Sequence, residues 1–205
     1  MNPHVLILAG CLAVFGVASL GLTQGVEPFL TWYYSFAWWP AIFAGQSGIK
    51  LKGGRATLWD DPRLFAQLPF LSLTVWLIFE ACNFRLGDWA YLNLPQSLPL
   101  RWLGYVLSFA SVLPALVTAA DVLEHLGLFA KARTRPLVRP QTLYGTLAST
   151  GVVCLVLPLA WPEIFFPLVW GGFVFLLEPW LHREGGDCLL RSEEHTSELQ
   201  SLAYL

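Results

Sequence analysis

Long apolar stretches alternate with short polar segments along most of this chain. Each stretch comes close to the roughly 20 residues that a helix needs to cross a bilayer. We therefore predict an all-α integral membrane protein with about six transmembrane helices. The predicted spans are Val5–Leu22, Phe29–Gly45, Leu64–Phe84, Trp102–Leu123, Leu143–Trp161 and Ile164–Leu181.

The first apolar stretch raises the question of a signal peptide. No Lys or Arg precedes it, and no clear pattern of small residues marks a cleavage site after it. A positively charged start and such a cleavage site are both typical of secretory signals. We therefore interpret this stretch as a retained span.

Composition supports the membrane prediction. Hydrophobic residues make up 56% of the chain and charged residues 13%, about half the charged share of a typical soluble domain. With a formal net charge of −2, the chain lacks the excess of basic residues that is typical of nucleic-acid-binding proteins. We therefore expect no nucleic-acid partner. The expected partner is the lipid bilayer, with a small molecule or a lipid as candidate substrate. The oligomeric state stays open.

Basic residues gather in alternate loops, which predicts the orientation. Lys and Arg are enriched in cytoplasmic loops of membrane proteins. The N-terminus is therefore expected in the cytoplasm and the chain in a bacterial inner membrane. The loops after the second and fourth spans carry Lys50, Lys52, Arg55 and Arg63, and Lys131, Arg133, Arg135 and Arg139; the loop after the third span carries Arg85 and Arg101.

The densest polar patch lies at the predicted outer end of the third span. Glu80 follows an apolar run, and an ionisable side chain there is costly and a functional candidate. It is either a proton carrier or general acid–base, or a partner of Arg85 that fixes helix packing. The candidate site residues are Glu80, Asn83, Arg85, Asp88, Trp89 and Tyr91.

A second set of acids lies near predicted inner ends of spans. Asp121, Glu124 and Glu178 are secondary candidates for a cytoplasmic-side cluster, with ordinary interfacial solvation as the alternative.

No metal-binding His motif, phosphate-binding glycine loop or nucleophile elbow occurs. We therefore expect no metal and no cofactor. The four Cys residues are interpreted as small buried hydrophobes.

The sequence contains one candidate internal repeat. Residues Ala37–Leu58 align without a gap on Val169–Leu190 at an offset of 132, and each copy is an aromatic span followed by a Gly-Gly turn. The copies would run in the same direction as parallel repeats. A rival offset of 98 would pair helices of opposite direction, and chance similarity is the other alternative.

Two motifs resemble a family. The pattern W-x3-E-x2-N followed by W-x-Y and Pro, at Trp76, Glu80, Asn83, Trp89 and Tyr91, is similar to a group of uncharacterised bacterial multi-pass membrane proteins. An acid-Pro pair before a glycine turn, from Glu178 to Gly186, resembles the group's second motif. The resemblance covers roughly residues 38–190 and implies a class without a function. A weaker likeness is to small carotenoid-cyclase-type membrane proteins, whose Pro-x-Glu-Glu motif is absent.

The last fifteen residues have a different character. Arg191–Leu205 resembles the translated read-through of a sequencing adapter. Without this segment, which carries one base and three acids, the formal net charge of −2 becomes zero. We expect an incomplete transmembrane domain over residues 1–190 and a non-native tail over residues 191–205. A polar, frayed terminus is the alternative.

The sequence leaves two functional hypotheses. The first is a permease-like protein with a polar intramembrane site around Glu80 and Asn83, which requires a cavity that reaches Glu80. The second is an intramembrane enzyme that acts on a lipid or isoprenoid, which requires a second acid within reach of Glu80. Whether the protein is an enzyme stays open.

Overall fold

A computed structural model describes residues 2–128, 140–186, 188 and 190. These residues form helices and connecting turns, with no β-strand among them. The all-α prediction is therefore confirmed for this part of the chain. The chain divides into two compact units: an N-terminal unit of Met1–Glu80 with Tyr91–Ala130, and a C-terminal unit of Ala81–Ala90 with Lys131–Leu205.

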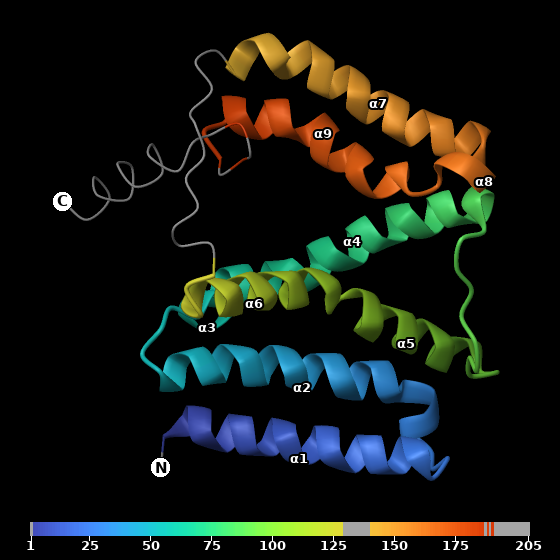
Figure 1. Ribbon diagram of the computed structural model, residues 1–205. Helices are drawn as coiled ribbons and strands as arrows, with labels where there is room; N and C mark the ends of the chain where they lie inside the picture. Colours follow the sequence, from blue (N-terminus) through green and yellow to red (C-terminus); the bar gives the residue numbers. More distant parts are fainter. Residues whose placement is uncertain (1, 129–139, 187, 189, 191–205) are drawn as a thin grey trace. The chain divides into compact units, whose positions relative to one another are not determined.

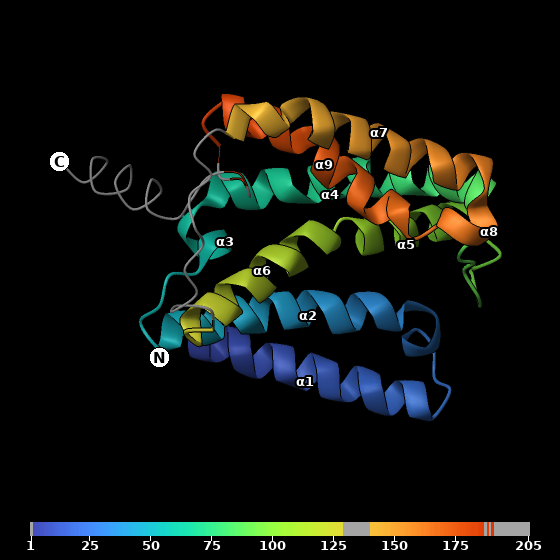
Figure 2. The same cartoon turned by 45° about the horizontal axis from the view of Figure 1, so that its top comes forward.

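The N-terminal unit begins with a helical hairpin. Helices α1 (Pro3–Thr23) and α2 (Phe29–Leu51) lie side by side along their length (Figures 1 and 2). The side chain of Asn2 caps α1 by accepting from the His4 backbone N–H at 2.9 Å, and Pro3 follows where no intrahelical donor is needed. Many apolar side chains of α1 are exposed, including Leu12 and Leu20 at 60% and 63%.

The rest of this unit packs against α2. It contains α3 (Thr57–Asp60), α4 (Pro62–Leu86) as far as Glu80, α5 (Leu98–Phe109) and α6 (Val112–His125). Ile42, Leu58 and Leu68 from α2, α3 and α4 form the buried centre, with Trp39 and Phe65 packed around it. The short helix α3 also contacts α6. One small core therefore joins the three consecutive helices α2, α3 and α4.

The predicted helix Trp102–Leu123 is interrupted. The structure has two helices there, α5 and α6, with Ala110 and Ser111 between them. Pro114 lacks the N–H that a continuous helix would use at this point. The buried Ser72 hydroxyl of α4 donates to the Phe109 carbonyl and accepts from the Leu113 N–H at 3.0 Å. It thus stands between the two groups that would bond each other in an unbroken helix.

The C-terminal unit contains a second helical hairpin. Helix α7 (Tyr144–Ala160), preceded by the 3₁₀ turn η1 (Pro140–Leu143), lies beside α9 (Leu168–Arg183), and the short α8 (Pro162–Phe165) connects them (Figure 1). A Cβ added to Gly151 would stand 2.6 Å from the Leu176 backbone nitrogen. Because glycine has no side chain, the two helix backbones can approach closely here.

In the described part of the chain, four helical stretches are long and apolar enough to cross a membrane: Pro3–Thr23, Pro62–Leu86, Leu98–His125 and Gln141–Ala160. Helices also form at the predicted second and sixth spans, but α2 contains several polar side chains and α9 has 16 residues. The prediction of six spans is therefore not confirmed. The basic loop with Lys131, Arg133, Arg135 and Arg139, and the tail 191–205, lie outside the described residues.

The helices α2 and α9 end in turns of the same geometry. Gly53 and Gly185 both have positive φ, at 73° and 77°. The next glycine donates back to the carbonyl five residues earlier, from Gly54 to Ile49 at 3.0 Å and from Gly186 to Leu181 at 2.9 Å. Such a bond, closed by a left-handed glycine, is a common helix C-terminus.

Candidate functional site

Glu80 lies on α4 and is held by two aromatic donors. Its Oε1 accepts a hydrogen bond from Trp76 Nε1 at 3.0 Å, one helical turn earlier, and another from the Tyr91 hydroxyl. Trp76 Nε1 also lies 3.3 Å from the Tyr91 oxygen. The half-buried carboxylate therefore fixes both aromatic side chains, because charge-assisted hydrogen bonds are stronger than neutral ones.

Trp76 and Tyr91 belong to a wall of aromatic rings. Residues 102, 105 and 109 follow the spacing of one helix face on α5. Tyr105 stacks on Phe109 with centroids 5.5 Å apart, and Tyr91 lies 5.4 Å from Tyr105. The Trp76 ring meets Phe109 at 5.8 Å. The residues W-x-Y that the sequence singled out thus contribute one tyrosine to this wall, from the segment that joins α4 to α5.

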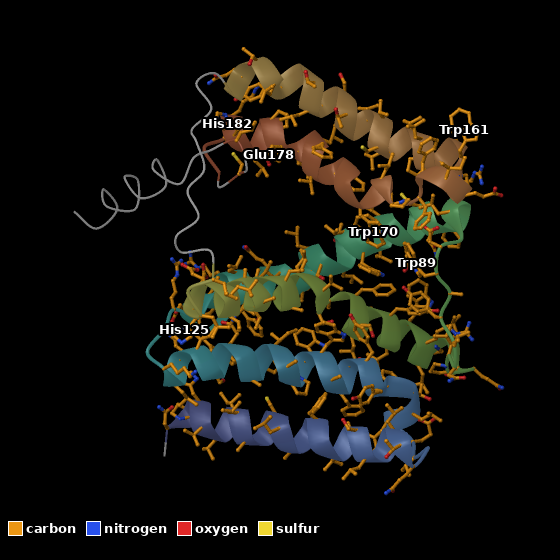
Figure 3. The ribbon with its side chains drawn as sticks, viewed as in Figure 1. Trp89, His125, Trp161, Trp170, Glu178 and His182 are labelled. Carbon is orange, nitrogen blue, oxygen red and sulfur yellow. The ribbon has the colours of Figure 1, made fainter. Side chains whose placement is uncertain are left out.

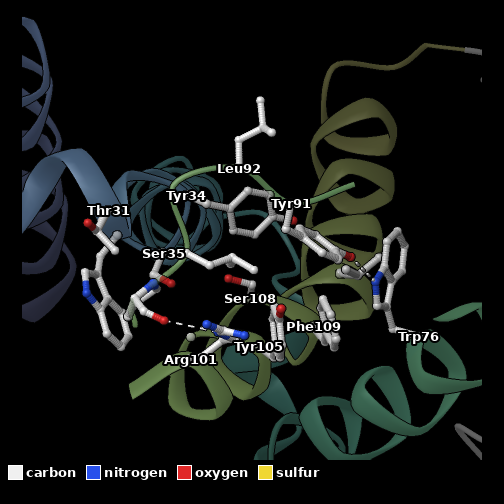
Figure 4. Close-up of a pocket in the computed structure, with 15 residues that line it drawn as sticks. Thr31, Tyr34, Ser35, Trp76, Tyr91, Leu92, Arg101, Tyr105, Ser108 and Phe109 are labelled. Carbon is white, nitrogen blue, oxygen red and sulfur yellow. Dashed lines mark hydrogen bonds between the residues drawn. The ribbon is translucent and has the colours of Figure 1, made fainter. Parts of the chain in front are cut away.

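This wall borders a pocket of about 240 Å³ within the N-terminal unit (Figure 4). Helices α2, α4 and α5 and the segment before α5 all contribute side chains, and the lining is mostly apolar. The lining residues are Thr31, Trp32, Tyr34, Ser35, Trp76, Tyr91, Leu92, Leu94, Pro95, Arg101, Gly104, Tyr105, Ser108, Phe109 and Val112.

Arg101 is the charged side chain in the lining of this pocket. It lies in the first turn of α5, and its Nε donates to the Pro95 carbonyl at 3.1 Å (Figure 4). This bond holds the segment before α5 against the helix. The sequence interpretation treated Arg101 only as a loop charge, because nothing in the local pattern indicates that the chain folds back over it.

The other residues of the predicted polar site make a different structure. The Asn83 side chain accepts from the Asp88 N–H at 2.9 Å and donates to the Trp89 carbonyl at 2.9 Å, so it stabilises the end of α4. Trp89 meets Trp170 of α9 with centroids 5.6 Å apart (Figure 3). The guanidinium of Arg85 reaches the Ala160 carbonyl at 3.5 Å. These contacts all lie within the C-terminal unit.

Asp121 takes part in a buried network. It accepts from Gln46 Nε2 at 2.7 Å and from both the N–H and the hydroxyl of Thr57, at 2.9 and 2.7 Å. Gln46, which is fully buried, also accepts from the Leu58 N–H at 3.0 Å. These bonds satisfy backbone N–H groups at the start of α3 that have no partner within the helix. The sequence interpretation missed Gln46 and Thr57, because neither residue belongs to a recognisable sequence motif.

The remaining secondary candidates differ in their surroundings. Glu124 is exposed near the end of α6. Glu178 is 5% exposed and accepts from the Leu190 N–H at 2.7 Å; it lies one helical turn from His182 on α9 (Figure 3). Asp121 and Glu178 belong to different units, so the acidic cluster stays a prediction. No group of three metal-binding side chains occurs among the described residues.

Comparisons with protein-family models, with curated proteins and with solved structures give no match for this chain. The resemblance to multi-pass bacterial membrane proteins therefore stays an expectation from the sequence motifs.

Proposed function

We propose that this chain belongs to a multi-pass protein of the bacterial inner membrane, permease-like in type, which binds a small amphipathic molecule in the aromatic pocket. The observation that carries the proposal is the pocket beside Glu80. Two of its lining residues, Trp76 and Tyr91, are oriented by hydrogen bonds to the Glu80 carboxylate. Ligand sites are usually concave, largely apolar and equipped with a few oriented polar groups.

Exposed apolar side chains support the membrane location. Leu12 and Leu20 on α1, Phe70 on α4 and Val156 on α7 are all more than half exposed. A soluble monomer rarely presents apolar surface on this scale. The same side chains would face lipid tails if these helices cross a bilayer. The basic loop residues favour a cytoplasmic N-terminus and six spans, with the pocket toward the outer side.

Equivalent hydrogen bonds support the parallel repeat at an offset of 132. Gln46 and Glu178 align, and each accepts through Oε1 from a backbone N–H twelve residues later, at Leu58 and Leu190. Both acceptors are buried. Chance similarity of two apolar helices would not require the same side-chain bond after the same Gly-Gly turn. The rival offset of 98 has no such support.

A pocket-filling variant tests the binding function. Gly104 lines the pocket, and a Cβ added there would find its nearest neighbour, the Trp32 ring, at 3.9 Å. Gly104→Leu should therefore fill the pocket and leave the helix intact. Gly16→Leu is the matched control, because nothing lies within 4 Å of a Cβ on Gly16.

The probes are three molecules with the same apolar body: 4-phenylbutyrate, 4-phenylbutanamide and 4-phenylbutylamine. Calorimetric titration of the purified chain in a maltoside detergent should detect binding of at least one. Gly104→Leu should abolish that binding, and Gly16→Leu should preserve it. The permease-like role requires saturable uptake of the bound probe into proteoliposomes. Failure of all three probes to bind would overturn the proposal, and chemical conversion of a bound probe would indicate an enzyme.

A further inference from the structure

We propose that the aromatic pocket selects an amphipathic anion, whose carboxylate or phosphate pairs with the Arg101 guanidinium while its apolar part lies against the aromatic wall. This inference rests on the proposed binding function and names its substrate class. It also assigns a binding role to Arg101, which lies outside the polar patch around Glu80.

Within the described part of the chain, the charge of Arg101 has no acidic partner. Its Nε donates a hydrogen bond to the neutral Pro95 carbonyl. Among the described residues, no carboxylate forms an ion pair with its guanidinium. The side chain is only partly accessible to solvent and borders a largely apolar pocket. A charge in such surroundings is costly unless it is paired, so the terminal N–H groups of Arg101 favour an incoming anion.

Two acids, Glu27 and Glu80, form hydrogen bonds with residues of the pocket lining. Glu27 binds Thr31, with 2.6 Å to the hydroxyl and 3.3 Å to the backbone N–H. Glu80 accepts from Trp76 and Tyr91 on the aromatic side. Each carboxylate thus fixes a lining residue, and neither neutralises Arg101.

The position of Arg101 in its helix increases the positive potential. Helix α5 begins at Leu98, and its first turn contains no acidic residue. The N-terminal end of a helix carries a partial positive charge from its free N–H groups. A basic residue in the first turn adds to this charge. An anion in the pocket would therefore be attracted by Arg101 and by the end of α5 together.

The aromatic rings beside Arg101 suit an apolar body. Tyr91, Tyr105 and Phe109 form a continuous surface of rings (Figure 4). The volume of about 240 Å³ accommodates a molecule of modest size with one ring or a short chain. A cation or a purely apolar molecule would leave the guanidinium without a partner. The combination favours a molecule with one acidic end and one apolar end.

The first test compares two probes that differ in charge alone. The chain in maltoside detergent at pH 7 is titrated with 4-phenylbutyrate and with its neutral analogue 4-phenylbutanamide. A charge-assisted bond contributes about 1.5–3 kcal/mol, so the carboxylate should bind roughly ten times tighter or more. Equal affinities of the two probes would overturn the anion selectivity and leave the binding function standing.

Variants assign the selectivity to Arg101. Arg101→Gln should reduce the affinity ratio of carboxylate to amide to about one, while Arg101→Lys should retain part of it, because lysine keeps the charge without the planar fork. Arg63→Gln is the matched control, since Arg63 is exposed and outside the pocket lining. An unchanged ratio in Arg101→Gln would overturn the assignment. The comparison of probes on the unaltered chain remains decisive if Arg101→Gln does not fold.

A competition experiment identifies the source of the anion. Phosphatidylglycerol is added to the micelles during the titration with 4-phenylbutyrate. Competition would assign the site to a lipid headgroup, and its absence would assign it to a free amphipathic acid. In both cases the anion selectivity holds. If neither probe nor the amine binds at all, the proposed function itself has failed, which is a different outcome from equal binding.

Discussion

At the scale of single residues, Tyr91 offers the most direct change to the pocket. Tyr91→Phe removes the hydroxyl that donates to Glu80 and leaves the ring in the wall. We predict a loss of about 1 kcal/mol in the free energy of unfolding, because a hydrogen bond to a charged group is lost at a partly exposed site. Titration with SDS in mixed micelles measures it. Tyr33→Phe, which removes a bond to the neutral Ser19 hydroxyl, is the control and should cost less.

A second residue-scale prediction concerns pH and the pair of Lys50 and Asp60. The Lys50 ammonium bound to Asp60, together with the Ala56 N–H at 2.9 Å, lowers the pKa of the Asp60 carboxyl below its ordinary value of 3.8. The pair therefore stabilises the fold above about pH 4 and ceases to do so as the pH falls through the lowered pKa. Because both groups are partly exposed, the effect stays below about 1 kcal/mol.

Asp60→Asn provides the measurement for this pair. The difference in unfolding free energy between the unaltered chain and Asp60→Asn should be largest near pH 6 and shrink between pH 4 and pH 2. A difference that stays constant over this range would contradict the contribution of the Asp60 charge.

Sequence reasoning identified Glu80 because an acid after an apolar run is costly, and Tyr91 because it lies in the same polar patch and in the W-x-Y motif of the resemblance. It could not find that they bond each other, since this depends on the path of residues 87–97 back toward α4. The place of Arg101 in the pocket lining was not predicted for the same reason. Asn83 was grouped with Glu80 by helical spacing, yet its side chain bonds the turn after α4. Spacing along one helix indicates which face a side chain occupies. Its hydrogen-bond partners depend on how the next segment folds.

At the scale of elements, Ser72 and Pro114 together explain the break between α5 and α6. We predict that Ser72→Ala costs about 1–3 kcal/mol, because the Phe109 carbonyl and the Leu113 N–H lose their partner in a buried place. Pro114→Ala restores an N–H, so in the double variant the helix can close and the two costs should not add. A double-variant cycle of unfolding free energies measures this coupling. Thr74→Ala, exposed on the same helix, is the control.

The α7–α9 contact supplies the second element-scale prediction. Gly151→Ala places a Cβ 2.6 Å from the Leu176 nitrogen and 2.9 Å from the Gly172 carbonyl oxygen. The helices must then separate, which we expect to cost about 1–3 kcal/mol. Gly145→Ala on the same helix meets nothing within 4 Å and should be neutral or slightly stabilising. Thermal unfolding of the two variants compares them. Equal stability would contradict a close helix contact at Gly151.

Hydropathy predicted where helices form but not where they are interrupted. Each predicted stretch contains a helix, and the ends agree within a few residues for α1 and α7. The short helices α3 and α8 and the break after Phe109 were not predicted. The positions of α3 and of the break depend on tertiary hydrogen bonds, such as those from Thr57 to Asp121 and between Ser72 and the α5–α6 break. An apolar pattern carries no information about such partners.

At the scale of the whole molecule, the number of membrane crossings decides the orientation of every loop. Helix α2 has 23 residues, enough to cross a bilayer, but its many Trp, Tyr and polar residues lower its hydropathy. Trp and Tyr favour the membrane interface and Gln46 is buried by protein. These residues therefore argue less against a crossing than their hydropathy indicates. The six-span arrangement requires α2 to cross.

Cysteine accessibility in intact cells tests this arrangement. The four native Cys residues are replaced by Ala, and single Cys residues are introduced at the exposed positions Gln24, Lys52 and Leu92. If α1, α2 and α4 all cross and the N-terminus is cytoplasmic, a membrane-impermeant maleimide should label positions 24 and 92 from outside. Position 52 should react only after permeabilisation. Labelling of positions 24 and 52 from the same side would show that α2 does not cross, and would reverse the side on which the pocket opens.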